Sequence, residues 1–303
     1  MIKIKDIIIP IEDDFIEFNN NLKKTTRSEV KLVNIVIDYA MKNKGKQLRP
    51  IICLLSAKLI SKPNESSITA ASLIEMLHVA TLIHDDIVDD SHLRRGWPSV
   101  KSVWKNKISL LLGDYIFSQA LSNMIKLKNF DALEVLSNTA KRLSQGELLQ
   151  MERSKTKDID ESTYLTMISD KTASLISSSC YFGYRSINTD NQCAEDLRKF
   201  GELLGICYQL KDDLFDIVGN IKDTGKPSSL DIKKNMLTLP YIYMLESVNS
   251  KERKKILSKL KYNIKVKDIS NLKRMIVNYG GIDYTENKIN ELSENAIGLL
   301  NKF

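Results

Sequence analysis

No proline occurs between Pro98 and Pro227, and this gap constrains the fold of the 303-residue chain more than any other feature. Because proline interrupts helices and central strands, a long interval without it indicates regular secondary structure joined by short connections. Apolar residues recur in this interval at helical spacing, without the alternation of β-branched and aromatic residues that strands show. The interval is therefore predicted to be mainly helical.

The same periodicity predicts helices along nearly the whole chain, and hence an all-α protein. The expected helices span Asp14–Thr25, Ser28–Met41, Leu48–Leu59, Ala70–Val88, Val100–Trp104, Leu110–Lys126, Phe130–Arg153, Ser162–Ser178, Asp190–Val218, Leu237–Leu245, Ser250–Lys261, Ile269–Asn278 and Ile282–Leu300. Ala70–Val88 and Leu203–Val218 are apolar nearly all round and are expected to pack on every side. No Pro- or Ser-rich linker divides the chain, so residues 1–303 are expected to form one domain.

Each of these two apolar segments ends in a cluster of aspartates. The clusters read Asp85-Asp86-Ile87-Val88-Asp89-Asp90 and Asp212-Asp213-Leu214-Phe215-Asp216. In both, two aspartates four residues apart share a helix face, where their like charges are costly unless a cation neutralises them. Paired carboxylates without a zinc-type Cys or His pattern favour Mg²⁺, which shares its coordination shell with substrate phosphates. One such cluster alone is equally typical of a solvated helix end, but two predict a diphosphate held between them by several metal ions.

Two pairs of basic residues suggest a second anion site. Arg94 and Arg95 are adjacent, so they point to different sides of the backbone and can address two anions. Lys46 and Arg49 lie three residues apart beside a glycine. Each pair alone is typical of a protein surface. Beside two metal-binding clusters, they suggest one diphosphate bound through Mg²⁺ and another bound by cations of the protein.

The net charge of +7 suits an anionic partner, but the sequence does not point to nucleic acid. The densest basic segment, residues 251–274, contains no nucleic-acid motif and is interpreted as solvated faces of late helices. The four cysteines form no paired pattern, which is typical of reduced thiols in the cytosol. The apolar N-terminus runs directly into acidic residues 12–14, unlike a signal peptide, and the apolar helix Ala70–Ile83 is too short to span a bilayer. A soluble, cytoplasmic protein is expected.

Further motifs accompany the aspartate clusters and the basic pairs. In chain order the set reads Gly45-Lys46-Gln47-Leu48-Arg49-Pro50, Glu75-Met76-Leu77-His78, His84 with the first cluster, Leu93-Arg94-Arg95-Gly96, Gly113-Asp114, Gln145-Gly146-Glu147, Lys171-Thr172-Ala173, Tyr208-Gln209-Leu210-Lys211 with the second cluster, Gly225-Lys226-Pro227 and Thr238-Leu239-Pro240. This ordered set covers nearly the whole chain and resembles the trans-prenyl diphosphate synthases of the polyprenyl synthetase family, in particular long-chain members such as heptaprenyl and octaprenyl diphosphate synthases. The resemblance implies an all-α isoprenoid synthase fold, a single large helical bundle in which the two Asp motifs face each other across a deep central cavity.

The resemblance also implies roles for individual residues. It assigns Mg²⁺ binding to Asp85, Asp89 and Asp212, and the support of these ligands to Asp86, Asp213 and Asp216. About three Mg²⁺ ions are expected per site once substrate is bound. Contacts to the allylic diphosphate are implied for Arg94, Lys171, Thr172, Gln209 and Lys226, with Lys171 also counted as catalytic. Contacts to isopentenyl diphosphate are implied for Lys46, Arg49, His78 and Arg95.

One position departs from the family pattern. Many relatives carry Gly-Lys where this chain has Asn235-Met236. Met236 cannot supply that cation, although Lys233 or Lys234 could, so this third basic position is left out of the predicted site.

The implied reaction is a head-to-tail condensation by ionisation, condensation and elimination. Mg²⁺, Lys and Arg stabilise the departing diphosphate of an allylic substrate, expected to be farnesyl or geranylgeranyl diphosphate. The double bond of isopentenyl diphosphate attacks the allylic cation, and a proton is then lost to the released diphosphate. No side-chain nucleophile is needed.

Product length is predicted from the residues just before the first Asp motif. In the family, bulky residues four or five positions before the motif close the tunnel that holds the growing tail. Here those positions hold the small residues Thr81 and Ala80. Each helical turn advances about 5.4 Å, comparable to one isoprene unit. The two small residues favour a long product, and the family resemblance implies roughly six to ten isoprene units, about C30–C50. Such a product suits a respiratory quinone tail and would be handed to a membrane.

The resemblance further implies a homodimer, and the chain could be the catalytic half of an enzyme that needs a small partner subunit. Three alternatives have less support. The pair His84-Asp85 occurs in metal phosphohydrolases, but those need more His ligands than the three that this chain has. Terpene cyclases mix Asn, Ser or Thr with Glu in their second metal motif. A non-catalytic subunit usually loses its Asp motifs, whereas this chain keeps both.

Overall fold

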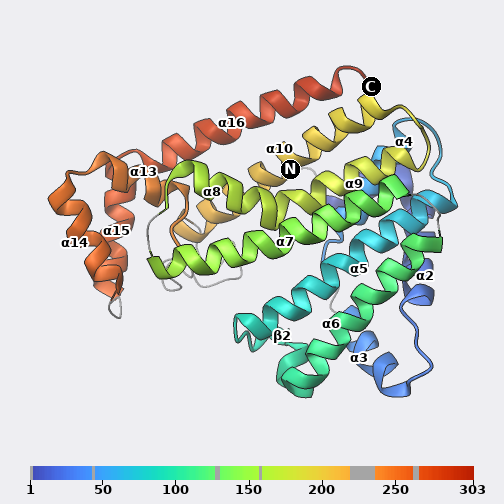
Figure 1. The fold of residues 1–303 in the computed structure, drawn as a ribbon. Coiled ribbons are helices and arrows are strands. Elements are labelled where there is room, and N and C mark those ends of the chain that lie inside the picture. The colour runs from blue at the N-terminus through green and yellow to red at the C-terminus, as the bar shows by residue number, and fades with distance from the viewer. Residues whose placement is uncertain (1–2, 43–44, 127–129, 157–158, 219–235, 262–265) are drawn as a thin grey trace. The chain divides into compact units, whose positions relative to one another are not determined.

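The computed structural model describes residues 3–42, 45–126, 130–156, 159–218, 236–261 and 266–303, and the structural statements below concern these residues. Packing divides the chain into two compact units. Unit 1 comprises Met1–Ala140, Leu175–Arg198 and Phe303, and unit 2 comprises Lys141–Ser174 and Lys199–Lys302. Both are built almost entirely from helices, as predicted (Figure 1). The organisation as one domain stays a prediction.

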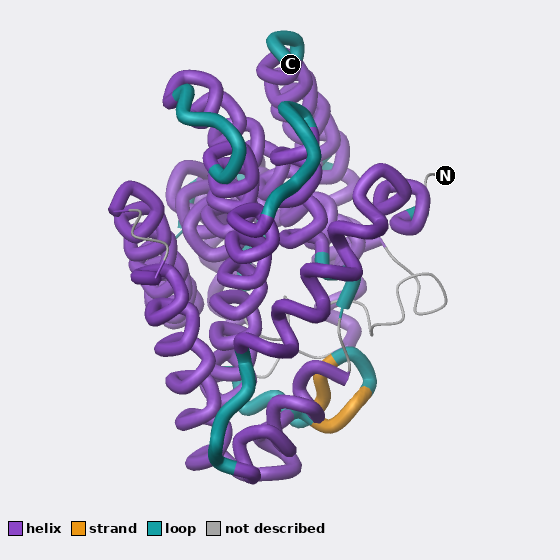
Figure 2. Tube along the Cα trace, turned by 90° about the vertical axis from the view of Figure 1, so that its right-hand side faces the viewer, coloured by secondary structure: helices purple, strands orange, loops and turns teal. Residues whose placement is uncertain are grey.

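Unit 1 contains the N-terminal helices and a short hairpin. Its elements are α1 (Ile4–Ile8), the 3₁₀ helix η1 (Ile9–Ile11), α2 (Glu12–Thr25), α3 (Lys31–Lys42), α4 (Leu48–Lys58), α5 (Glu65–Val88), β1 (Leu93–Arg94), β2 (Trp97–Pro98) and α6 (Val100–Lys126), together with the first part of α7 (Phe130–Thr156), most of α9 (Ser174–Arg185) and the start of α10 (Asn191–Val218). The two strands stand out in orange among the helices in Figure 2. Helix α5 packs against α2, α4 and α6 and forms the centre of the unit.

Helix α5 has the sequence of a core helix. Its N-terminus is fixed by a capping box, because the Asn64 side chain accepts the backbone N–H of Ser67 at 3.0 Å and Ser67 Oγ accepts the Asn64 N–H at 3.2 Å. Every residue from Ala70 to Leu77 is buried, which confirms the predicted all-round packing for this part. By length and composition, α5 is the one helix of the described chain that passes as a membrane-span candidate, yet 67% of its apolar window is buried inside the protein.

Unit 2 contains the remaining helices. They are the rest of α7, α8 (Glu161–Ile168), the π-helical segment η2 (Ser169–Ala173), the rest of α10, α13 (Leu239–Ser247), α14 (Ser250–Lys261), α15 (Val266–Asn278) and α16 (Gly281–Leu300). Helix α13 packs against α8, α15 and α16, and Tyr164, Leu239 and Met244 are fully buried in the core around it.

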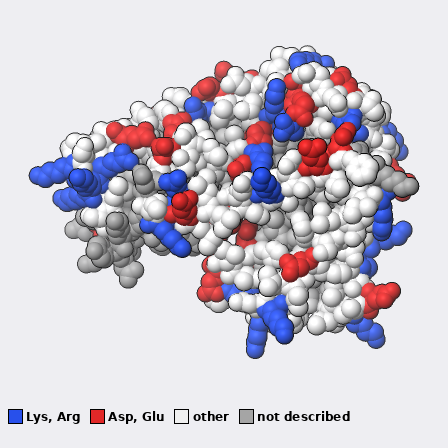
Figure 3. Space-filling view, viewed as in Figure 1, with Lys and Arg blue, Asp and Glu red and all other residues white. Residues whose placement is uncertain are grey.

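The basic residues of unit 2 gather over α14, at the left of Figure 3. Lys251, Lys254 and Lys255 on this helix are exposed. This part of the basic segment therefore forms a solvated helix face, as predicted.

Four details of the secondary structure differ from the prediction. Residues 4–11 form α1 and η1, where no helix was expected, and the hairpin β1–β2 was also not anticipated. The two helices expected on either side of residues 105–109 form the single element α6, with non-helical dihedral angles at Lys105. The helix expected over Ser162–Ser178 is interrupted by the π segment and continues to Arg185.

The prediction that Leu203–Val218 packs on every side is wrong. Tyr208, Phe215 and Val218 are about half exposed, at 50%, 47% and 53%. The physical reason is that these apolar side chains share the helix with exposed Lys211 and Asp212, so one face of α10 remains open. The Lys211 ammonium lies 5.5 Å from the centre of the Phe215 ring, a cation–π contact on that face.

The cysteines are free thiols, as expected. Cys53, Cys180 and Cys207 are buried, and Cys193 is partly buried. Burial raises the pKa of the Cys180 thiol to about 12 and also raises that of Cys53. Both thiols are therefore protonated and chemically inert in the folded protein.

Candidate functional site

The first Asp motif forms the C-terminal end of α5 in unit 1. Asp85 is partly buried, Asp86 is 4% exposed, and Asp89 caps the helix, its N–H bonded to the Asp85 carbonyl at 2.8 Å. Asp86 is paired within the protein, since Arg94 Nε donates to Asp86 Oδ1 at 2.9 Å and Arg94 Nη2 also contacts that oxygen. Asp86 thus holds Arg94 in place. The role predicted for Asp86, the support of the metal ligands, stays a prediction.

The hairpin that follows α5 is fixed at its base. Arg95 and Gly96 occupy its turn, with φ angles of 53° and 80° in the left-handed region. Ser99 ties the two ends together, because its N–H bonds the His92 carbonyl at 2.9 Å and its Oγ donates to the Ser91 carbonyl at 2.7 Å. Arg94 contacts Asp86, and Arg95 lies against Gly45. That the two arginines address two separate anions stays a prediction.

A second ion pair anchors the start of this hairpin segment. Asp90 has a φ of 52° and is paired with Lys101, whose side chain is 9% exposed. The hydrogen bond from Lys101 and its charge lower the pKa of Asp90. Sequence analysis did not identify Lys101, because one lysine in α6 carries no recognisable motif.

Three of the four residues predicted to contact isopentenyl diphosphate lie together in unit 1. Arg49 Nη1 lies 3.0 Å from His78 Nε2, and because arginine only donates, Nε2 accepts and the ring proton lies on Nδ1. The Arg95 guanidinium lies against Gly45, where an added Cβ would come within 2.8 Å of Nη1. Lys46 is exposed and does not line the cavity described next.

A small cavity of about 70 Å³ opens beside these residues. His78, Asp86, Arg94 and Arg95 all line it. Burial, together with the positive charges of Arg49, Arg95 and Arg94, holds the pKa of His78 well below its ordinary value. His78 is therefore a neutral hydrogen-bonding group at a strongly cationic site.

A pH-dependent stability follows from the lowered pKa of His78. Below the ordinary histidine pKa of about 6.5, the unfolded chain binds a proton at this residue that the folded chain does not, so the free energy of unfolding should decrease as pH falls through this range. His78→Gln keeps an acceptor for Arg49 without a titrating group and should make the decrease shallower. Urea unfolding at pH 7.5, 6.5 and 5.5 measures how the free energy of unfolding depends on pH. His92→Gln on the exposed loop is the matched control. Equal slopes for wild type and His78→Gln would contradict the prediction.

The two residues predicted to set product length lie one helical turn before the first Asp motif. Ala80 is 2% exposed, and Thr81 is partly buried with its Oγ1 donating to the His78 carbonyl at 2.8 Å. Neither residue lines the 70 Å³ cavity. Their role stays a prediction.

His84 has a structural environment. Its Nε2 lies 3.3 Å from Asp114 Oδ1 and 3.3 Å from the Leu110 carbonyl, and its ring lies against Gly113. Within the described ranges, no group of three or more His, Cys, Asp or Glu side chains is placed to hold a metal.

The second Asp motif lies on α10 in unit 2. Asp213 is 5% exposed and accepts hydrogen bonds from the Tyr164 hydroxyl and from Gln209 Nε2, the latter at 2.7 Å. Gln209 in turn accepts Thr172 Oγ1 at 2.9 Å. Asp212 is exposed. These hydrogen bonds connect Thr172, Gln209, Asp213 and Tyr164 in series. They fix the buried Asp213 carboxylate beside the exposed Asp212. Sequence analysis missed Tyr164.

Asp216, the last carboxylate of this motif, lies near a lysine of α15. Burial lowers the pKa of Lys273, and the negative charge of Asp216 acts in the opposite direction. Lys273 was also missed, because its helix is distant from the motif in the sequence.

Lys171 is held by two side chains of α7. Its Nζ lies 2.5 Å from Glu147 Oε2 and 3.0 Å from Gln150 Oε1. Glu147 belongs to the motif Gln145-Gly146-Glu147, which resembles the family pattern but had no assigned role. Glu147 is the ion-pair partner that positions this lysine.

Lys171 and Thr172 lie in the π segment η2, where the Ser174 N–H bonds the Ser169 carbonyl. Two glycines allow neighbouring helices to approach this segment closely. A Cβ on Gly146 of α7 would lie 2.7 Å from the Lys171 nitrogen, and one on Gly205 of α10 would overlap Ala173. π-helical turns are rare and frequently occur at functional sites.

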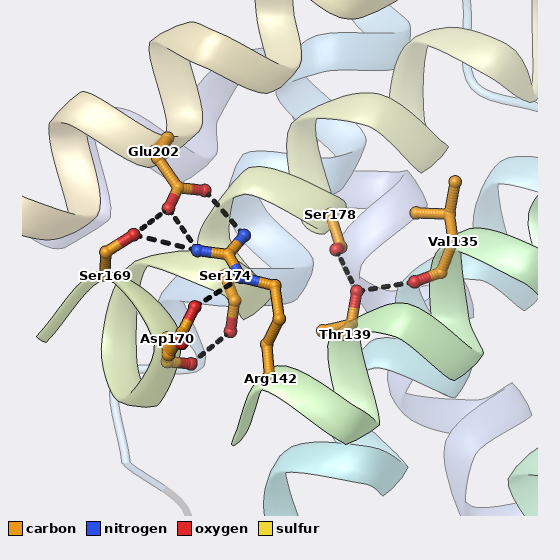
Figure 4. A network of polar contacts seen from close by, with 8 residues as sticks. All are labelled: Val135, Thr139, Arg142, Ser169, Asp170, Ser174, Ser178 and Glu202. Carbon is orange, nitrogen blue, oxygen red and sulfur yellow. Dashed lines mark hydrogen bonds and ion pairs between the residues drawn. The ribbon is translucent and has the colours of Figure 1, made fainter. Parts of the chain in front are cut away.

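Arg142 of α7 fixes the start of the same segment (Figure 4). Its Nε donates to Asp170 Oδ1 at 2.6 Å, and its Nη2 donates to Glu202 Oε1 at 2.5 Å and to Ser169 Oγ at 2.8 Å. Burial alone would lower the pKa of Arg142, but the hydrogen bonds and charges of Glu202 and Asp170 raise it above its ordinary value. These ion pairs support the segment that carries Lys171.

A cavity of about 220 Å³ in unit 2 is lined by most of the predicted site residues of this unit. Its lining includes Lys171, Thr172, Gln209, Asp212 and Asp213. The predicted residue Lys226 lies in 219–235, outside the described residues, as do Lys233 and Lys234. That the two Asp motifs face one common cavity stays a prediction.

The donor set is compatible with Mg²⁺. In each motif, one buried aspartate is bonded to protein donors, and another carboxylate, Asp89 or Asp212, is exposed to solvent. Mg²⁺ is commonly bound by one or two carboxylates together with waters and substrate phosphates, so a cluster of three protein ligands is not required.

Comparison with known proteins agrees with this description. The family model for polyprenyl synthetase matches residues 30–277. Component 2 of heptaprenyl diphosphate synthase from Geobacillus stearothermophilus is 33% identical, over 80% of this chain and 76% of that protein. An all-trans-nonaprenyl-diphosphate synthase, described as geranyl-diphosphate specific, from Rhodobacter capsulatus is 31% identical, over 98% of this chain and 91% of that protein.

A solved structure shares the fold over almost the entire length. The decaprenyl diphosphate synthase from Rhodobacter capsulatus matches with a TM-score of 0.93 and 28% identity, covering 99% of this chain and 93% of that one. The fold is therefore the all-α isoprenoid synthase fold, and the activity class is that of a prenyltransferase. The chain belongs to the polyprenyl synthetase family.

Proposed function

We propose that the chain is an all-trans long-chain polyprenyl diphosphate synthase, which adds isopentenyl diphosphate repeatedly to an allylic diphosphate. The observation that carries the proposal is the cavity in unit 2, where Asp212, Lys171, Thr172 and Gln209 converge. Carboxylates for a cation and donors for a phosphate lie there side by side, as an allylic diphosphate requires. The long-chain products in the names of the related proteins support a product of about C30–C50. One isoprene unit is about as long as one helical turn, ~5.4 Å.

The proposed residue roles follow from this chemistry. Asp85, Asp89 and Asp212 would hold Mg²⁺, which when bound supplies positive charge to the departing diphosphate. Asp86, Asp213 and Asp216 support these carboxylates. Lys171, held by Glu147 at 2.5 Å, places an ammonium where negative charge develops on the leaving group.

The remaining steps need no side-chain nucleophile. The allylic C–O bond breaks with its electron pair on the diphosphate, the isopentenyl double bond forms a new C–C bond to the cation, and the proton released goes to the free diphosphate. Apolar lining residues of the cavity, Ile159, Met167 and Ile168, exclude water from the cation. Arg49, His78 and Arg95 would bind isopentenyl diphosphate, with Lys46 at the exposed edge. Arg94, whose guanidinium holds Asp86, would contact the allylic diphosphate, as would Lys226.

The finer features of the proposal come from the family resemblance. We propose about three Mg²⁺ ions per occupied site, farnesyl or geranylgeranyl diphosphate as primer, and a cytoplasmic homodimer that passes its product to a membrane. The relative named as component 2 of a heptaprenyl synthase supports a small partner subunit as the alternative assembly.

The direct test is an incubation of the purified chain with Mg²⁺, radiolabelled isopentenyl diphosphate and farnesyl or geranylgeranyl diphosphate. A product ladder that ends at one long polyprenyl diphosphate and disappears with EDTA is the expected result. No incorporation by folded protein would contradict the proposal for the chain acting alone.

Product length has its own test at Ala80. Ala80→Phe places a large ring one turn before the first Asp motif and should shorten the final product by one or more isoprene units of roughly 5 Å each. Since Ala80 is 2% exposed, circular dichroism must first show that the variant folds. Ala80→Ser, which keeps the small volume, is the matched control. An unchanged product ladder in folded Ala80→Phe would refute this role.

A further inference from the structure

The cavity beside the second Asp motif contains a cation that neither the motifs nor the family resemblance assigns. Arg153, in the last turn of α7, lines the same 220 Å³ cavity as Lys171, Asp212 and Asp213. Lys171 and Arg153 are the two Lys or Arg side chains in its described lining. We propose that Arg153 is a further substrate-binding residue, which contacts the allylic diphosphate; this inference rests on the proposed function.

The helix geometry aims Arg153 and Lys171 at one place. Arg153 follows Gln150 by three residues, so the two share a face of α7. Gln150 Oε1 accepts the Lys171 ammonium at 3.0 Å, which places that face against the lysine. The cavity therefore receives one cation from α7 and one from the π segment.

The chemistry of the side chain suits a diphosphate. A guanidinium presents a planar fork of N–H donors that matches two phosphate oxygens at once, and it stays charged at every physiological pH. Met236 lines the same cavity and contributes no charge. A cation at either position would therefore reach the same bound anion, so the two positions are expected to be functionally exchangeable.

The exchange can be tested by steady-state kinetics on the full chain. Arg153→Met should raise KM for the allylic diphosphate about 10- to 100-fold, the usual effect of losing a charge-assisted hydrogen bond, and leave KM for isopentenyl diphosphate within about two-fold. Arg153→Lys should retain part of the affinity, and the double variant Arg153→Met with Met236→Lys should regain most of it. Lys155→Met, which removes an exposed cation of the same turn, is the matched control and should change neither KM. Unchanged allylic KM in Arg153→Met, or no recovery in the double variant, would overturn the inference.

A second measurement separates this inference from the proposed function. Calorimetric titration with inorganic pyrophosphate and Mg²⁺ reports on anion binding whether or not a polyprenyl product forms. Weaker pyrophosphate binding by folded Arg153→Met than by Lys155→Met supports the inference even if wild type makes no product, an outcome that would reject only the proposed function. Equal binding by wild type and both variants would reject the role of Arg153.

Discussion

Replacing Gly183 by alanine is expected to destabilise the protein by about 3 kcal/mol, the upper end of the usual cost of overpacking. A Cβ at this position of α9 would lie 2.8 Å from the Cys53 carbonyl carbon and 2.9 Å from Ser56 Cβ, and would also overlap the Cys53 carbonyl oxygen. These atoms belong largely to the backbone of α4, so they cannot rotate away as the end of a flexible side chain would. Urea unfolding followed by circular dichroism measures the loss.

The chain offers a matched control at Gly298. This glycine lies in α16 with no atom within 4 Å of an added Cβ. Gly298→Ala should therefore stabilise the protein, by about 0.5–1 kcal/mol, through the better helix propensity of alanine. If the two variants shifted stability in the same direction and by similar amounts, the close contact between α9 and α4 would not be the cause.

Replacing Asp212 by asparagine should lower kcat/KM for chain elongation by at least about 100-fold, because a proposed metal ligand loses its charge while its shape is kept. Since Asp212 is exposed, the substitution should leave the free energy of unfolding nearly unchanged. The half-saturating Mg²⁺ concentration should rise in parallel. Measuring initial rates over a Mg²⁺ titration tests both effects.

Asp38→Asn is the control for general loss of negative charge. Asp38 pairs with Arg27 at 3.0 Å on the surface of unit 1, and its side chain is 57% exposed. This variant should keep the wild-type rate and Mg²⁺ dependence. Wild-type kinetics in Asp212→Asn would reject Asp212 as a metal ligand and weaken the proposed mechanism.

The fold class and much of the site chemistry can be predicted from the sequence because they depend on local patterns. The apolar run in Ala70–Val88 predicts a core helix, and residues Ala70–Leu77 are buried as expected. The adjacent arginines of the hairpin both line the small cavity of unit 1, and His78 lies with Arg49 and Arg95. Each of these features follows from residue spacing or from a motif several residues long.

The features that sequence analysis missed depend on contacts between distant residues. Glu202 meets Arg142 across sixty positions, Tyr164 meets Asp213 across forty-nine, and neither pair belongs to one motif. The burial of Leu203–Val218 was overestimated because apolar composition does not reveal which face of α10 stays open. The hairpin strands are two residues each, too short to show a strand period.

The π segment has a consequence for how α8 and α9 relate along the chain. A π turn contains an extra residue relative to an α turn, and one residue corresponds to about 100° of rotation in an α-helix. The side chains after Ala173 are therefore out of phase with those before Ser169, although the helix axis continues. Deleting one residue from Ser169–Ala173 would restore the phase and turn every side chain of α9, from Ser174 to Arg185, onto a different neighbour. The five residues Ser169–Ala173 therefore set the rotation of α9 about its helix axis. Deleting a residue there would rotate α9 rather than simply shorten the chain.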